Sequence, residues 1–256
     1  MSSPVARLAP LAVSLGLLLG GWSLAGVWLS PELVPPPWRV LPVLGGLASG
    51  AEFWRALGLT AARGALGLGF GLCAALALGI PAGLNRTAVA LLGPLVAALQ
   101  SCPPVLWTSL VMVWAGTGSA MPVLVVFAGV FPPLFANVAQ GCAALDPRYA
   151  AMARLYRVPW PRRLAREVLP GIAPAVLAGL SYALAAAWKI TAVAEYLGAD
   201  DGLGARMYWA YRMLDVPALF AWASVLMLAG VSLEIGLVAR LRRAALRYTS
   251  RARGTQ

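Results

Sequence analysis

The sequence predicts an all-α protein that crosses a membrane about six times. Of its 256 residues only 11% are charged, and the mean hydropathy is +0.79. Soluble domains carry roughly 25% charged residues, so this chain has too few polar side chains to cover a soluble fold. Several apolar runs also reach the roughly 20 residues that a helix needs to cross a bilayer. We therefore expect one polytopic membrane domain over residues 1–256.

The N-terminal run allows two interpretations, a signal peptide or a first membrane helix. One arginine precedes a long apolar stretch, and no small-residue cleavage site clearly follows it. We therefore interpret residues 8–29 as the first span. The next segment, from Pro31, contains five prolines and two pairs of an aromatic and a basic residue. We expect an outer loop that leads into a helix at the membrane interface, anchored by Trp38 and Trp54.

The remaining apolar runs predict five further spans, one of them interrupted. A proline pair, Pro103-Pro104, falls inside the third run and removes two amide donors, so an unbroken helix there is excluded. Two interpretations stay open for that run, namely two short helices or one sharply kinked span. The pair is interpreted as either a hinge of a moving gate or a fixed kink. The expected spans after the first are residues 61–84, 88–116 (broken), 123–140, 172–197 and 218–239.

A basic insert, residues 146–170, separates the fourth span from the fifth. Asp146 is a suitable N-cap and Pro147 suits the first helical position, so a helix is predicted to follow over 149–156. Pro159 then disfavours helical dihedrals in the residue before it, while Pro161 suits the start of a second short helix that ends near Pro170. The insert is therefore predicted to be a helix-turn-helix finger, which a purely topological loop would not need.

The distribution of arginine indicates the orientation of the chain. Fourteen arginines fall on the side of the insert and the two termini: Arg7, Arg86, the six of the insert (148, 154, 157, 162, 163, 166) and the six of the C-terminal tail (240, 242, 243, 247, 251, 253). Five are expected outside or at the interface: Arg39, Arg55, Arg63, Arg206 and Arg212. The positive-inside rule then places the insert and both termini in the cytoplasm. The tail would meet anionic lipid headgroups, whereas no aromatic-interleaved soluble module accompanies the charge, which argues against a nucleic-acid partner.

The insert resembles a motif of the membrane subunits of bacterial binding-protein-dependent ABC importers. That motif is written E-A-A-x3-G-x9-I-x-L-P. Here Ala151-Met152-Ala153, Arg157 and Glu167-Val168-Leu169-Pro170 stand at its fixed positions. Ala153, Leu169 and Pro170 match it, whereas Ala151, Arg157 and Glu167 replace its glutamate, glycine and isoleucine. Because the glycine is absent, we expect Pro159 and Pro161 to impose the bend instead. The segments "QSCPPVLW", "FPPLFAN" and "AEYLGADDGLG" are similar to the nitrate, sulfonate and taurine permease branch.

The resemblance implies the fold, the partners and the role of the insert. It implies the type I importer permease fold in a bacterial inner membrane, with a second permease copy, two copies of an ATP-binding subunit and an extracytoplasmic solute-binding protein. The insert would then be the coupling helix that docks into the ATP-binding subunit. Similar permeases carry nitrate, sulfonates, taurine, bicarbonate or small heteroaromatic precursors, and the sequence does not choose among these. The coupling residues implied are Tyr149, Ala151, Met152, Ala153, Arg154, Tyr156, Arg157, Leu169 and Pro170.

The single lysine, Lys189, is the most informative polar residue of the predicted spans. An ionisable group in a span usually faces a cavity or a partner. Two interpretations stay open. In the functional one, Lys189 is a cation that lines an anion path. In the structural one, it forms an ion pair or its side chain snorkels to the interface. Glu195 lies six residues later, too far round the helix for an ideal pair. With Pro103 and Pro104, these two residues form the candidate translocation path. Asp200 and Asp201 sit in a glycine-rich external turn, either as turn formers or as a docking contact for the binding protein.

Several kinds of chemistry have no residues to support them. Lys189 has no glycine-rich phosphate loop around it, so ATP and Mg²⁺ are expected on a partner subunit and no cofactor on this chain. The chain has no histidine, and its three cysteines are isolated, which argues against a metal site or a disulfide framework. An intramembrane enzyme would have only a formal Ser-Lys pair, and a secondary carrier would leave the finger unexplained and usually shows an internal repeat. We therefore predict a transport subunit and not an enzyme.

Overall fold

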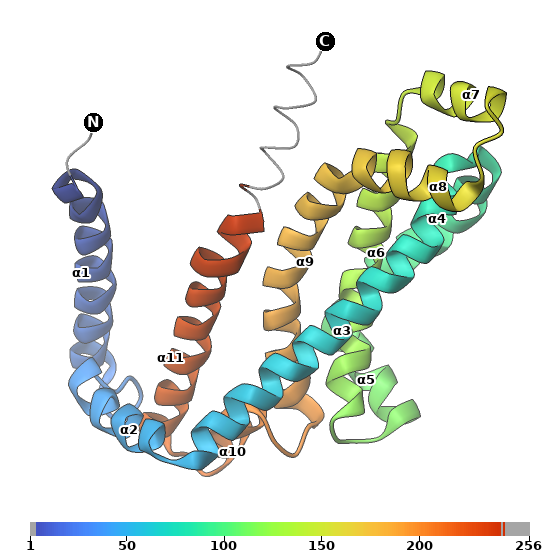
Figure 1. Ribbon diagram of the computed structural model, residues 1–256. Coiled ribbons are helices and arrows are strands. Elements are labelled where there is room, and N and C mark those ends of the chain that lie inside the picture. The colour runs from blue at the N-terminus through green and yellow to red at the C-terminus, as the bar shows by residue number, and fades with distance from the viewer. Residues whose placement is uncertain (1–3, 242, 244–256) are drawn as a thin grey trace.

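The computed structural model describes residues 4–241 and 243, and every regular element in this part of the chain is helical (Figure 1). This confirms the predicted all-α fold. Three long helices, α3, α6 and α9, pack against one another at the centre, and α11 and α1 lie beside them. The α-helices are α1 Pro4–Leu29, α2 Pro37–Ser49, α3 Ala51–Leu84, α4 Arg86–Ser101, α5 Pro104–Ala115, α6 Ala120–Ala143, α7 Pro147–Leu155, α8 Trp160–Arg163, α9 Leu169–Gly198, α10 Leu203–Arg212 and α11 Val216–Leu233, with π-helical segments η1 Leu164–Val168 and η2 Glu234–Val238.

Four described helices are long and apolar enough to cross a membrane, or five if a bent pair counts as one span. The helix of the predicted second span begins at Ala51 and not at residue 61, because the interfacial segment around Trp54 continues into it without a break. The helix α1 is 26 residues long and contains Arg7 as its one charged residue, so its length suits the predicted first span. The expected six spans are therefore an approximate count.

The proline pair breaks the third run into two helices. Pro103 precedes α5 and Pro104 occupies the first turn of that helix, where a missing amide donor costs no hydrogen bond. The helices α4 and α5 meet at an angle of 96°. Of the two interpretations left open by the sequence, the structure therefore has the two short helices.

Small residues in α3 allow α6 to approach it closely. Glycine or alanine recurs every four residues along one face of α3, at positions 67, 71, 75, 79 and 83. A Cβ atom built on Gly67 or Gly71 would lie 2.6 Å from side-chain carbons of Val126 or Val130 in α6. Such stripes of small residues let helix backbones pack tightly in membranes. This interface forms the largest part of the hydrophobic core, which continues into α9 through Ile172.

The helices place two groups of connections at opposite ends of the molecule. The N-terminal end of α1, the C-terminal end of η2, and α7 with α8 lie at one end, whereas α2, α10 and the turn after α9 lie at the other (Figure 1). Of the basic tail, Arg240 and Arg243 are described, and Arg242, Arg247, Arg251 and Arg253 lie outside the described residues.

Candidate functional site: a coupling finger, a buried ion cluster and a lysine cavity

The basic insert folds as two helices joined by a sharp turn. The Asp146 side chain caps α7 by accepting a hydrogen bond of 2.8 Å from the amide of Arg148. The second helix does not end near Pro170, as the sequence suggested, because α8, η1 and α9 form one helix of 39 residues. Pro170 lies in the first turn of α9, directly after η1. A π-helical turn opens the hydrogen-bond ladder, which accommodates a residue that has no amide donor.

The turn of the insert is made by Arg157, which stands at the glycine position of the importer motif. Its φ of 49° lies in the left-handed region. The amide of the next residue, Val158, donates to the Ala153 carbonyl at 2.9 Å and closes the end of α7. The expectation that Pro159 and Pro161 impose the bend in place of a positive-φ turn is therefore wrong. The positive-φ turn is kept, and a non-glycine residue adopts it at a cost of about 1–2 kcal/mol.

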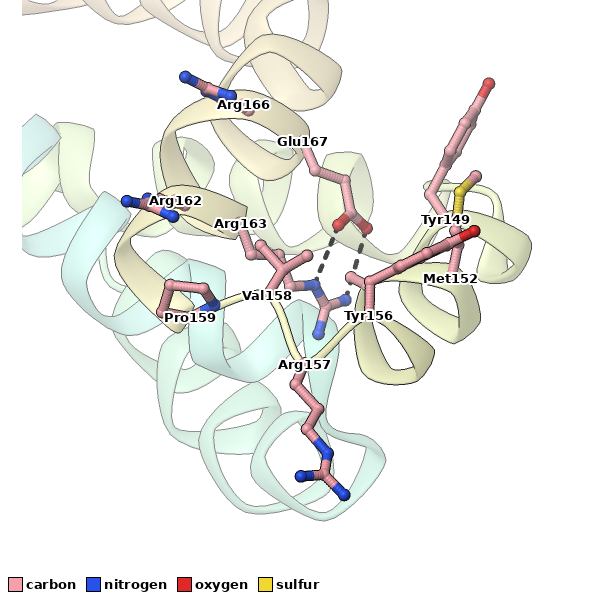
Figure 2. A pocket seen from close by; sticks show the side chains of 11 residues that line it. Tyr149, Met152, Tyr156, Arg157, Val158, Pro159, Arg162, Arg163, Arg166 and Glu167 are labelled. Carbon is pink, nitrogen blue, oxygen red and sulfur yellow. Dashed lines mark hydrogen bonds and ion pairs between the residues drawn. The ribbon is translucent and has the colours of Figure 1, made fainter.

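A recess of about 520 Å³ opens between α7 and α8–η1 (Figure 2). Tyr149, Met152 and Tyr156 line one side of it and are 59%, 51% and 72% exposed. Their spacing of three and four residues makes them one stripe along α7. These three of the implied coupling residues therefore form one exposed stripe, with the two tyrosine rings and the methionine on one side of the recess (Figure 2).

An ion pair lies in the middle of the recess. The Nε atom of Arg163 lies 3.1 Å from a carboxylate oxygen of Glu167, one helical turn away, and both side chains are mostly buried (Figure 2). Glu167 stands where the motif has isoleucine, so the arginine neutralises a carboxylate at a position that is apolar in the motif. The remaining motif residues are accessible to differing degrees: Ala151, Arg154, Leu169 and Pro170 are exposed, and Ala153 is half-buried.

At the opposite end of the molecule, Glu195 and Arg63 form a buried ion pair. The two side chains are 0% and 3% exposed, and the shortest nitrogen–oxygen distance between them is 2.8 Å. Thr60 donates to the second carboxylate oxygen at 2.7 Å, and the amide of Gly204 donates to it at 3.2 Å. Burying a charge is costly unless it is paired and hydrogen-bonded, and here both conditions are met. Glu195 therefore joins α9 to α3 and α10.

This cluster extends into the turn that follows α9. Arg63 donates to the backbone carbonyl of Asp201 at 2.6 Å, pairs with its carboxylate, and donates to the Ser119 hydroxyl at 2.7 Å. A Cβ atom on Gly202, whose φ is 107°, would lie 2.4 Å from the Glu195 carboxylate. The glycine is therefore required both for the turn and for its close approach to the charge.

Two sequence expectations change because of this cluster. Arg63 was expected outside or at the interface, but it is buried inside the bundle. Glu195 was grouped with Lys189 in the translocation path, but its carboxylate is enclosed by α3 and α10. Asp200 is exposed, as a docking residue would be, whereas the carboxylate of Asp201 pairs with Arg63 and lies 4.0 Å from Arg55.

Lys189 lies in a different environment, along a cavity of about 1250 Å³. The cavity follows one face of α9 and is bordered by residues of α5, α10, α11 and η2, and it stays partly open. Lys189 is exposed, and Pro104 lines the same cavity, whereas Pro103 is not among its lining residues. Most other lining residues are apolar or aromatic, among them Tyr182 and Tyr196. The structure thus places a cation on an accessible, largely apolar face within a span.

Comparison with known proteins decides the family. A family model described as "binding-protein-dependent transport system inner membrane component" matches residues 67–247, well over half of the chain. The chain belongs to this family. It is therefore a membrane-spanning permease subunit of an ABC importer, which works with an ATP-binding subunit and a solute-binding protein. This confirms the resemblance, and it confirms a transport subunit over an enzyme or a secondary carrier.

Individual relatives agree with this assignment. The taurine transport system permease protein of Escherichia coli (strain K12) is 28% identical over 94% of this chain and 90% of its own length. The nitrate import permease protein of Synechococcus elongatus is 25% identical over 79% of this chain and 76% of its own length. A solved structure of a methionine ABC transporter, titled as inward facing, has a TM-score of 0.63 and 16% identity. It covers 75% of this chain and 94% of the matched chain. At that identity the structure supports the permease fold alone.

Sequence reasoning missed Arg63, although a signal for it was present. Arg63 interrupts an apolar run in "TAARGALG" just as Lys189 interrupts another, so the same cost of burial applied to it. It was assigned to the surface because the predicted span began two residues earlier, at residue 61. Its partners lie 132 and 138 residues later in the chain, and no local pattern could identify them.

Proposed function

We propose that two copies of this permease enclose the path by which an ATP-driven importer carries a small anionic solute. The observation that carries the proposal is the accessible position of Lys189 along the cavity beside α9. Two ATP-binding subunits would hydrolyse ATP with Mg²⁺, and an extracytoplasmic binding protein would deliver the solute.

The environment of Lys189 favours a water-filled path over lipid. An ammonium group at the centre of a membrane helix costs about 2.5–3.5 kcal/mol on insertion scales when it has to face the membrane. The side chains of Tyr182, Lys189 and Tyr196 recur at helical spacing on one accessible face of α9. A single copy leaves this face open, so a second copy placed against it would turn the cavity into an enclosed path.

Two charged residues line the cavity, Lys189 and Glu234, and Lys189 is the one that would attract an anionic cargo. The taurine and nitrate permeases among the relatives are named for solutes that carry a sulfonate or a nitrate group. A lysine in a water-filled path between helices attracts such groups more strongly than a lysine in bulk water does, and the aromatic lining supplies apolar contact for an organic part of the solute. Pro104, at the bend between α4 and α5, lines the same cavity and would let this pair of helices shape the path.

The two ends of the molecule would meet the other subunits. We infer that the insert and both termini face the cytoplasm, because Arg63 is buried and only four arginines remain at the outer end. The stripe on α7 would dock into the ATP-binding subunit, as amphipathic helices dock into grooves. At the outer end, the exposed Asp200 would contact the binding protein, while Asp201 would hold the turn through Arg63.

The test is transport in vesicles that contain the permease, its ATP-binding subunit and its binding protein. We expect Lys189→Gln to reduce anion uptake about tenfold or more, with complex assembly and basal ATP hydrolysis unchanged. The matched variant Lys189→Arg keeps the cation and should retain most of the uptake. Stimulation of ATP turnover by taurine, other sulfonates, nitrate and an uncharged heteroaromatic solute would identify the cargo. Uptake at the wild-type level in Lys189→Gln would contradict a path lined by this lysine.

A further inference from the structure

The coupling insert carries a charge that nothing else in the described chain balances. Residues 146–170 contain six arginines and two carboxylates, Asp146 and Glu167, and therefore have a net charge of +4. Asp146 caps α7 and Glu167 pairs with Arg163, so both carboxylates already have partners. Among residues 4–241 and 243, no carboxylate forms an ion pair with the other arginines of the recess.

These arginines share one recess with the docking stripe. Arg157, Arg162 and Arg166 are exposed and line the cavity that Tyr149, Met152 and Tyr156 line from the other side. Arg162 and Arg166 are one helical turn apart and point to the same side, while Arg157 points away from the tip of the turn (Figure 2). The guanidinium groups of Arg162 and Arg166 lie on the side of α8 and η1 that faces away from Tyr149, Met152 and Tyr156 (Figure 2). A partner that encloses the insert therefore meets the apolar stripe on one side and unbalanced positive charge on the other.

We propose that the groove of the cognate ATP-binding subunit is acidic and presents carboxylates to Arg157, Arg162 and Arg166. The proposal rests on the docking role of the insert given above and adds the chemistry of its partner. At the position of the motif's glutamate the chain has Ala151, which is exposed, so the insert offers no carboxylate there either. The charge pattern would make this permease select an acidic groove and reject a basic one, because like charges across an interface repel.

The position of the insert favours a protein partner over anionic lipid. α7, which forms one wall of the recess, lies beyond the ends of α6 and α9, while α8, which carries Arg162, lies beside the connection between α3 and α4 (Figure 1). A membrane surface would meet the flanks of the spans, whereas the recess lies between two helices and has the volume to accept side chains of a partner. Planar guanidinium groups are also suited to paired hydrogen bonds with carboxylates.

The experiment measures binding of the purified cognate ATP-binding subunit to the permease in nanodiscs of neutral lipid. The variant is R162E/R166E, with R162Q/R166Q as a milder form. The control is R39E/R212E, which makes the same charge change at two exposed arginines of the opposite end. We expect association with R162E/R166E to slow about tenfold or more at about 50 mM salt, and the difference from wild type to shrink at about 300 mM, where charges are screened. Lysines introduced for carboxylates in the groove of the ATP-binding subunit should restore binding.

The possible outcomes separate this proposal from the docking role itself. If R162E/R166E binds like the wild type at low salt, the groove is not acidic and the proposal is overturned. If the loss appears only in discs of anionic lipid, the arginines serve the membrane, and the proposal is likewise overturned. In both cases Met152→Asp would still release the ATP-binding subunit if docking through α7 is correct. The thermal unfolding temperature of each variant should match that of the wild type, because both substituted arginines are exposed.

Discussion

Arginine has opposite roles at the two ends of this permease. At one end, Arg63 is buried, and its charge is matched by Glu195 and Asp201 within the same chain. At the other end, Arg162 and Arg166 are exposed and line a recess without a carboxylate partner in the described chain. In this chain the pairing of an arginine, more than its presence, indicates its role. A charge balanced inside the chain stabilises the fold, and a charge left unbalanced at an accessible recess indicates a partner.

The largest effect should follow from removal of the buried guanidinium. Arg63→Met would leave Glu195 enclosed without its counter-charge, and breaking a buried pair in this way costs about 3–5 kcal/mol. We expect a large drop in the unfolding temperature in detergent, or loss of folded protein. Arg55→Gln is the control, since Arg55 is 77% exposed and only approaches Asp201. If Arg63→Met and Arg55→Gln unfold at the same temperature, the buried pair of Arg63 stabilises the fold no more than an exposed arginine does, which would contradict its assigned role.

A smaller effect is expected at the edge of the same cluster. Asp201→Asn removes one carboxylate from Arg63 but leaves the pair with Glu195 and the backbone carbonyl of residue 201 in place. Asparagine keeps an acceptor oxygen but removes the charge, so the cost should stay within the range of about 1.5–3 kcal/mol for a hydrogen bond to a charged group. Thermal unfolding should show a decrease clearly below that of Arg63→Met. A decrease as large as that of Arg63→Met would mean that Asp201, and not Glu195, is the main partner.

The smallest effect concerns the turn of the basic insert. Arg157→Gly would remove the strain of a left-handed arginine, but glycine also gains entropy in the unfolded chain, so the net gain in stability should be within about 1 kcal/mol. Arg157→Val, a β-branched residue at positive φ, should instead destabilise the insert. Limited proteolysis of the 146–170 segment measures this local stability. Faster cleavage of Arg157→Gly than of Arg157→Val would contradict the assigned turn geometry.

The sequence predicted those features that depend on local patterns. Apolar run length predicted the helical membrane fold, Asp146 and Pro147 predicted the start of α7, and Pro103-Pro104 predicted the break between α4 and α5. The cluster around Arg63 was missed because its ion pairs join residues more than 130 positions apart. The continuous helix through Pro170 was missed because a proline normally ends a helix, and the π-helical turn that accommodates it leaves no clear sequence signal.

We propose that the insert transmits work from the ATP-binding subunit through the stripe on α7. The most direct test is Met152→Asp, with Met152→Leu as a control that keeps an apolar side chain of similar size. Co-purification of the ATP-binding subunit and ATP-driven uptake in vesicles are measured for each variant. We expect Met152→Asp to lose the subunit or to hydrolyse ATP without uptake, Met152→Leu to behave like the wild type, and Arg163→Gln to have a smaller effect than Met152→Asp. Full retention of both the partner and transport by Met152→Asp would show that this insert is not the coupling element.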